Sequence, residues 1–589
     1  MFGWMGKIIK IDLTQRIIEN YPVPADWWEK YLGGRGLGVK IYNEICSAQT
    51  DPFSAENAVI FLTGPLTGTV FTSGRYQVVS RSPLTGTICD SSSGGSFGAI
   101  LKRTGVDGLI ITGKAEKPVY LEMVESEIFI KTAEDIWGLN TQQTRDKLTA
   151  RLKSGASVAS IGPAGENLVP FAAIMNDKDR AAGRGGMGAV MGSKNLKAIS
   201  VYGTKMTKVH DNEKLKELQV KLDRLIDKNP ITGKSLPLLG TSVLVNIINA
   251  HGMYPTENFK RGVFNDAEGT SGEKITENLL QSKSACFRCP IACGRSTATS
   301  RKSGEGPEYE TVWAFGAQLG VNDLNAITEA NYACNELGLD TITTGSTIGC
   351  AMELIEQGAM DWDLKWGDAA KLVDLVTDIA YKKGWGKDLA LGSKQLAQKY
   401  GRPELAMQVK GMELPAYDPR GVQGQALAYA TSSRGGCHMK AYMISTEILG
   451  EPVFMDRFST AGKAEIVTLF QDISAVVDSL ILCRFIQFAF ATETFCKMLE
   501  YVTGIKFDEA KLLEVGKRIY TLERDFNCRA GFTRDDDNLP SRFLQEKLEE
   551  GPSRNRIVEL DSMLTEYYKV RGWNETGIPL EETKKELGI

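Results

Sequence analysis

The sequence predicts an α+β protein in which an N-terminal β-rich domain is followed by two mainly α-helical domains. Short apolar runs broken by glycine and proline continue to about residue 203, and amphipathic helical periodicity takes over after residue 205. The chain of 589 residues also exceeds what one hydrophobic core usually serves. The predicted domains span residues 1–205, 206–410 and 411–589.

The N-terminal domain is predicted to be built on antiparallel sheet. The gaps between its strand-like runs are mostly of hairpin length, which leaves no room for repeated crossover helices. One helical interval, residues 141–152, interrupts them. The runs that we expect to form strands are 7–13, 58–64, 76–80, 108–113, 119–124, 127–132 and 157–162.

The remainder of the chain is predicted to be helical. Amphipathic periodicity marks helices at 212–226, 325–338 and 371–384. The turn-rich stretch 413–425 opens the third domain, and a further helical block begins at about residue 461.

Composition limits the classes of function. The 69 basic and 73 acidic residues leave a formal charge of −4, so nothing points to nucleic acid or to an anionic membrane surface. The first residues lack the apolar core of a signal peptide, and the apolar stretch 479–491 is too short and too polar to cross a membrane. We therefore expect a cytoplasmic protein. Three histidines are too few for a multi-histidine metal site.

The strongest chemical signal is a C-x2-C-x3-C stretch formed by Cys286, Cys289 and Cys293. Three thiolates at this spacing can converge on one iron–sulfur cluster. A zinc site or buried free thiols are the alternatives, but no second cysteine pair of the kind that structural zinc requires is present. A fourth ligand must come from elsewhere, and spacing does not choose it.

Glycine-rich segments at 72–76, 91–95 and 180–188 form the second signal. Their backbones can approach a ligand closely, and Arg75, Arg180 and Arg184 can contact phosphate. Residues 183–188 match G-x-G-x-x-G, but no buried strand precedes them, so a dinucleotide fold is not indicated. Tight turns without a ligand are the alternative.

A third signal joins Glu310, ahead of an apolar helical run, to His438 in the stretch 434–440. A carboxylate and an imidazole in one pocket can divide general-base and general-acid work. Surface or capping roles are equally open from these residues alone.

Taken together, these segments resemble the tungsten-containing aldehyde ferredoxin oxidoreductase family of tungstopterin enzymes, over nearly the whole chain. The segments that carry the resemblance are 64–69, 74–86, 160–177, 181–199, 306–314, 336–342, 413–421 and 434–440.

The resemblance implies a particular architecture. The β-rich domain would form a saddle for a bis-pterin tungsten cofactor, with the tungsten held by pterin sulfurs. Cys483 would complete the ligands of one 4Fe-4S cluster, and a magnesium ion would lie between the pterin phosphates. The residues that match cofactor-binding positions of the family are Arg75, Ser92, Ser93, Gly94, Arg180, Ala181, Gly183, Arg184, Asn335, Asp340, Lys440, Asp478 and Leu482.

The implied activity is oxidation of an aldehyde to the carboxylic acid. Glu310 would be the general base, His438 would hydrogen-bond the aldehyde oxygen, and electrons would leave singly to ferredoxin or a ferredoxin-like subunit. A related tungstopterin subunit that reduces an aromatic acyl-CoA ring is the enzymatic alternative, and a non-catalytic electron-transfer subunit is the other.

Several positions depart from the family pattern. Asn335 replaces an aspartate, Ser92 an asparagine, and Ile481 a glycine, which disfavours a positive φ. Some relatives pair two subunits through a metal held by an E-x-x-H stretch, which here reads Glu329 to Tyr332. We therefore expect that any homo-oligomer lacks such an interface metal site.

Overall fold

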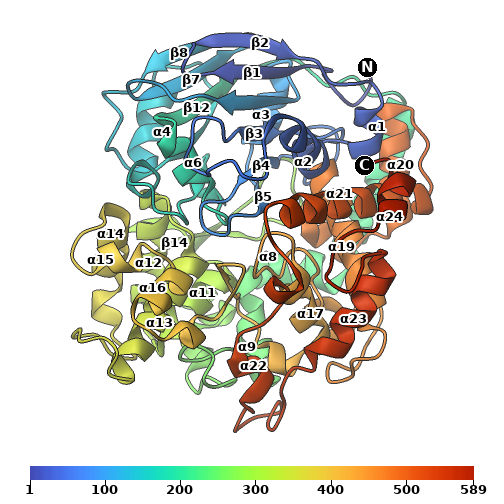
Figure 1. Ribbon diagram of the computed structural model, residues 1–589. Coiled ribbons are helices and arrows are strands. Elements are labelled where there is room, and N and C mark those ends of the chain that lie inside the picture. The colour runs from blue at the N-terminus through green and yellow to red at the C-terminus, as the bar shows by residue number, and fades with distance from the viewer.

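The computed structural model describes residues 1–589, with two mixed sheets at the N-terminal end and helices over most of the rest (Figure 1). The first sheet has the strand order β2-β1-β6-β3-β4-β5 and the second β11-β10-β9-β12-β7-β8. Strands of the first sheet are β1 (Ile8–Asp12), β2 (Ile17–Tyr21), β3 (Val59–Leu62), β4 (Tyr76–Arg81), β5 (Ile88–Ser93) and β6 (Gly108–Thr112). Strands of the second are β7 (Val119–Val124), β8 (Glu127–Thr132), β9 (Ser157–Ile161), β10 (Ile174–Asn176), β11 (Arg180–Ala182) and β12 (Leu196–Tyr202).

Most neighbouring strands are antiparallel, as the short gaps predict, but two pairs are not. β1 pairs with β6 and β7 pairs with β12 in parallel. Parallel neighbours need a crossover connection, and the chain between β1 and β6 includes the helices α2 (Gly34–Ile45) and α3 (Phe97–Arg103). The expectation of purely antiparallel sheet was wrong for these two pairs.

The predicted helix at 141–152 is confirmed as α4 (Thr141–Thr149), with a capping box at Asn140. Helix α2 was missed because its sequence, GRGLGVKIYNEI, is rich in glycine. The structure explains one of these glycines: a Cβ at Gly36 would lie 2.5 Å from the Tyr31 carbonyl oxygen. The glycines that this close packing requires thus hide the helical pattern in the sequence. The other short helices of this region are α1 (Trp27–Tyr31), α5 (Pro163–Glu166) and α6 (Met187–Ser193).

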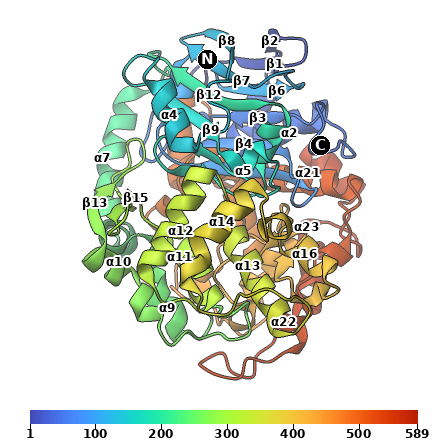
Figure 2. The same ribbon diagram turned by 90° about the vertical axis from the view of Figure 1, so that its left-hand side faces the viewer.

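The helical part follows the predicted periodicity, with α12 and α14 packed together below the sheets (Figure 2). A small unpredicted sheet, β13 (Leu280–Ser284), β14 (Gly294–Ala298) and β15 (Ser303–Glu305), lies within it. The helices of seven or more residues in this part are α7 (Asn212–Lys228), α9 (Leu244–Ala250), α10 (Gly272–Asn278), α11 (Tyr309–Phe315), α12 (Leu324–Leu337), α13 (Thr341–Glu356), α14 (Leu372–Tyr381), α16 (Ser393–Lys399), α17 (Gln423–Thr431), α19 (Lys463–Leu480), α20 (Thr492–Thr503), α21 (Glu509–Arg529), α23 (Leu560–Arg571) and α24 (Glu581–Leu587).

The N-terminal sheet and the last helices share one hydrophobic core. Ile60 and Leu62 of β3 belong to the same buried cluster as Leu480 of α19 and Ile519 of α21. Burial of this apolar surface therefore ties the two ends of the chain together. The domain boundaries near residues 205 and 410 stay predictions.

Ile481 has a positive φ, although its side chain disfavours one. Its φ is +65°, at the end of α19. A β-branched residue in this region is strained by about 1–3 kcal/mol. Two glycines make room for its side chain: a Cβ at Gly34 or Gly64 would lie 2.6 or 2.9 Å from an Ile481 carbon. The chain thus accommodates a β-branched residue with a positive φ two positions before Cys483.

No single helix is long and apolar enough to span a membrane. Only one bent pair of short segments, Pro230–Leu239 with Thr241–Ala250, meets the criteria of length and composition.

Candidate functional site

A cavity of about 340 Å³ lies where the three predicted domains meet. Its wall combines glycine-rich loops of the N-terminal domain, the loop between β13 and β14, the start of α11, the α12–α13 turn and the segment after α19. Predicted site residues on this wall are Arg75, Gly94, Arg180, Ala181, Gly183, Cys286, Cys289, Cys293, Glu310, Asn335, Asp340 and Cys483.

The four predicted cluster cysteines all line this cavity. Burial raises the pKa of Cys289 to about 11, and the nearby Cys483 thiol raises it too. No three His, Cys, Asp or Glu side chains lie close enough to hold a single metal ion. Four thiols spread around a cavity fit a multi-iron cluster better than one zinc ion.

The glycine-rich loops place Arg75 beside the cysteines. Its Nε donates to the Ser92 hydroxyl at 3.0 Å. At Gly94, a Cβ would lie 2.9 Å from the Cys286 sulfur, so only glycine allows this approach. Ser93 is fully buried and bonds Asn176, which turns its side chain away from the cavity.

The two arginines of the 180–188 loop have different partners. Arg180 lines the cavity and its Nη2 donates to Glu305 at 2.8 Å. Arg184 donates to Asp340 at 3.2 Å and to the carbonyl of Glu413 at 2.7 Å. Arg184 therefore stabilises the cavity wall without lining the cavity, whereas Arg180 lines it and can contact a ligand.

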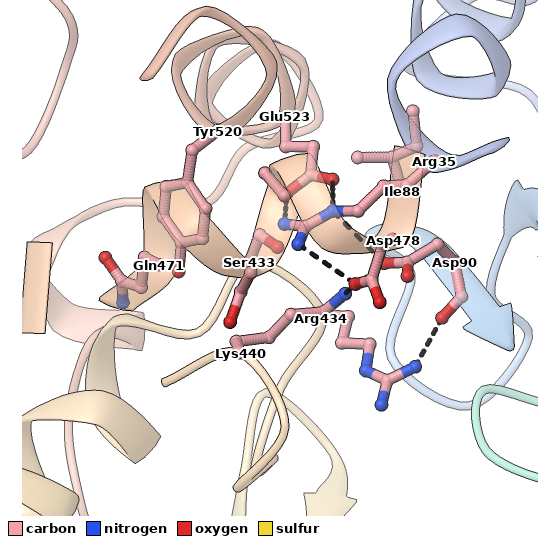
Figure 3. Close-up of polar contacts among 12 residues, drawn as sticks. Arg35, Ile88, Asp90, Ser433, Arg434, Lys440, Gln471, Asp478, Tyr520 and Glu523 are labelled. Carbon is pink, nitrogen blue, oxygen red and sulfur yellow. Dashed lines mark hydrogen bonds and ion pairs between the residues drawn. The ribbon is translucent and has the colours of Figure 1, made fainter. Parts of the chain in front are cut away.

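Lys440 and Asp478 belong to a buried ion network next to the cavity (Figure 3). The guanidinium of Arg35 is fully buried and donates twice to Glu523, both at 2.6 Å. Burial opposes ionisation of Asp90, but Lys440 and Arg35 hold its pKa below the usual range. Because buried partners satisfy one another, loss of one typically costs about 3–5 kcal/mol. Leu482, also buried, belongs to the shared hydrophobic core.

Glu310 lines the cavity, and His438 contacts it although His438 is not itself among the lining residues. The His438 Nε2 lies 3.6 Å from Glu310 Oε1, and the other carboxylate oxygen accepts from the Ala416 N–H at 2.9 Å. Burial raises the pKa of Glu310 to about 8. Burial also lowers the pKa of His438 to about 3, with help from Arg184. Imidazole is therefore neutral near pH 7.

Aromatic rings surround this pair. The ring centroids of Tyr417 and Tyr442 lie 5.8 and 6.1 Å from that of His438. Tyr309 packs 5.5 Å from Tyr417. The free atoms Glu310 Oε1 and His438 Nδ1 have no hydrogen-bond partner, so two polar groups are left for a ligand.

Several residues of the site were missed by sequence reasoning. A single acidic or hydroxyl residue has no sequence pattern around it that marks a site. Arg35 and Glu523 are far apart in the sequence, and only the fold brings them together as an ion pair. Arg434 donates to the Cys437 sulfur at 3.0 Å. It lies in the stretch 434–440, which the sequence marks only through His438. The further residues that line the cavity are Thr72, Asp179, Ser284, Ile291, Gly294, Glu305, Gly306, Glu308, Thr311, Asn331, Leu339, Thr341 and Phe485.

Two family models match consecutive parts of the chain. Residues 8–203 match the model of the aldehyde ferredoxin oxidoreductase N-terminal domain, and residues 217–589 match the model of domains 2 and 3. The tungsten-containing aldehyde ferredoxin oxidoreductase of Pyrococcus furiosus is 47% identical, over 100% of this chain and 99% of its own. That of Thermococcus kodakarensis is 45% identical with the same coverage.

More distant relatives have other names. The WOR-like subunit of an aliphatic sulfonate oxidoreductase from Pyrococcus furiosus is 30% identical, over 100% of this chain and 97% of its own. Among solved structures, the active-site complex BamBC of benzoyl coenzyme A reductase, in complex with 1,5-dienoyl-CoA, matches with a TM-score of 0.87 and 25% identity, over 100% and 97% of the two chains. On the full-length family match, this chain is an oxidoreductase that belongs to the tungsten-containing aldehyde ferredoxin oxidoreductase family.

Proposed function

We propose that the chain oxidises an aldehyde to the carboxylic acid and passes the electrons to ferredoxin or a ferredoxin-like subunit. The observation that carries the proposal is the Glu310–His438 pair, with a 3.6 Å contact, at a cavity whose wall also holds four cysteines. A bound tungstopterin would accept two electrons from the substrate and release them singly. Identity of 45–47% to named aldehyde enzymes over the full length supports this assignment.

The chain's own residues would divide the work. Glu310, when ionised, would take a proton from the attacking water, and the neutral His438 would donate its N–H to the aldehyde oxygen. The tyrosines around His438 would exclude water and receive an apolar or aromatic side chain of the substrate.

The cofactors would be held by residues already described. Cys286, Cys289, Cys293 and Cys483 would bind one 4Fe-4S cluster, since they share one cavity. Arg75 and Arg180 would contact the anionic part of a bis-pterin, and Asn335 and Asp340 would accept its N–H groups. A magnesium ion would be bound between the phosphates, near Ser92.

The test is a metal analysis of the purified protein, joined to turnover of an aldehyde panel with viologen dye. We expect tungsten, four irons per chain and oxidation of at least one aldehyde. A second candidate, reduction of an aromatic acyl-CoA, is favoured by the likeness to the benzoyl coenzyme A reductase complex. Benzoyl-CoA therefore joins the panel, and turnover of it without any aldehyde would replace the first proposal.

Assembly is the remaining proposal. Glu329 bonds Thr299 at 3.0 Å and pairs with Arg301 at 3.3 Å, while the Tyr332 hydroxyl bonds Thr297 at 2.7 Å. Both side chains thus have partners within the chain. Any homo-oligomer would be held by protein contacts and not by a metal at this position.

A further inference from the structure

Glu413 is a buried carboxyl group with no role in the chemistry above. Its side chain is fully buried at the strand β17 (Met412–Glu413), and it makes no salt bridge. One oxygen, Oε1, accepts from the Ser393 N–H at 2.9 Å and from the Ser393 hydroxyl at 2.8 Å. The other, Oε2, lies 2.7 Å from the Thr343 hydroxyl oxygen.

The Thr343 hydroxyl lies between two carboxyl groups. Besides Glu413, its Oγ1 lies 2.8 Å from Oδ2 of Asp340. A hydroxyl has one hydrogen to donate, so it can satisfy only one of the two. If both acids were ionised, the other contact would bring two oxygen lone pairs together in a buried place. One of the two acids must therefore carry a proton.

The surroundings decide which acid that is. Asp340 has a cation, because Arg184 Nε donates to the same Oδ2 at 3.2 Å. Glu413 has no such partner, since Arg184 contacts only its backbone carbonyl. Burial raises the pKa of Glu413, although the Ser393 N–H opposes this. The remaining titratable neighbour, Cys350, is fully buried with a raised pKa and is a neutral thiol.

We propose that Glu413 is protonated in the resting protein and that the chain Glu413–Thr343–Asp340 is a proton relay to the cofactor cavity. Asp340 is the end of the chain that lines the cavity. The proton moves from Glu413 Oε2 to Thr343 Oγ1 while the Thr343 hydrogen moves to Asp340 Oδ2. At Thr343 one O–H bond breaks and one forms, no electrons are transferred, and the three groups keep a single negative charge.

The use of this relay rests on the proposed function. Oxidation of an aldehyde, RCHO + H2O → RCOOH + 2 H⁺ + 2 e⁻, releases protons into the cavity. Once Asp340 has received the Glu413 proton and given it up, a proton released in the cavity can return from Asp340 to Glu413 by the reverse transfer. Its far side contacts Ser393 at the start of α16, whose next residue, Lys394, is exposed. The chain thus runs from the cavity to Glu413, whose other oxygen is bound by Ser393.

Infrared difference spectroscopy of the resting holoenzyme tests the protonation state without turnover. In Glu413→Gln the amide keeps the shape and both kinds of hydrogen bond, so we expect normal folding and loss of one carboxylic-acid C=O band. Thr343→Val should keep that band but shift it to higher frequency, because its partner is gone. A difference spectrum between the parent and the Glu413→Gln protein that contains only carboxylate bands would overturn the proposal.

Two comparisons complete the experiment. Glu353 lies on the same helix as Thr343, and Arg542 donates to it at 2.6 Å. Glu353→Gln is the matched control and should leave the carboxylic-acid band in place. If the Glu413 variant does not accumulate, an unshifted acid band in Thr343→Val overturns the proposal. Both relay variants should lose turnover in parallel with unchanged tungsten and iron, and full turnover in both would refute the relay. A parent inactive on every aldehyde would sink the proposed function and leave the infrared result standing.

Discussion

The raised pKa of Glu310 predicts that aldehyde oxidation accelerates in mildly alkaline solution. Only the ionised carboxylate can accept a proton, and burial moves its pKa to about 8. At pH 7 the ionised fraction is then about one eleventh, and at pH 9 it is about ten elevenths, so kcat/KM should rise about tenfold between them. The neutral His438, with a pKa of about 3, does not change state over this range.

The assay is the initial rate with viologen dye over a series of pH values, at constant tungsten and iron content. Glu310→Gln should lower kcat/KM by about 10²–10⁴ and remove the alkaline rise. Glu356→Gln is the matched control, because it removes an exposed carboxylate that pairs with Lys260 at 2.7 Å. A Glu310→Gln protein whose rate keeps the parental pH profile would refute the assignment of the base.

Three further predictions concern assembly and stability. Cys483→Ala should fail to assemble a complete cluster, because an iron without its fourth protein ligand is readily lost. The measurement is iron per chain, and a full four-iron cluster in this variant would remove Cys483 from the ligand set. The stability of the parent apoprotein should fall as the pH rises from about 4.5 through about 8, because the folded state holds a proton on Glu310 that the unfolded state has lost. Glu310→Gln should abolish that part of the pH dependence in calorimetry, and an unchanged slope would contradict it. Metal analysis of any oligomer should show no ion bound by Glu329, and an iron or zinc ion bound there between two copies would contradict the proposal.

The sequence predicted those features that depend on local spacing. Period-3.6 patterns located α7, α12 and α14 within a few residues. The spacing of three cysteines within eight positions predicts a cluster loop, and the structure places all three on one cavity wall, while the cluster itself stays a proposal. Cys483 could be assigned only by family resemblance, because nearly 200 residues separate it from Cys293 and no local pattern marks it. The structure places it on the same cavity wall, while its role as a ligand stays a proposal.

Features that depend on contacts between distant residues could not be predicted from the sequence. Glycines that make α2 a close-packed helix look, in a sequence, like turn formers. The sequence gives no hint that Glu413 is protonated. Its charge state depends on which of the two acids beside Thr343 is paired with a cation, and in the fold Arg184 pairs with Asp340 and not with the Glu413 carboxyl group. Long-range partners therefore decide both the packing and the charge state.

The ion pair of Arg35 with Glu523 joins positions separated by 488 residues. During synthesis, Arg35 leaves the ribosome long before its partner has been made, and chains grow at about 5–20 residues per second. The N-terminal sheet must then remain for at least about 24 seconds with a charged and apolar surface uncovered. Because Cys483 and Phe485 also line the cavity, its wall cannot be completed before that late segment has been translated.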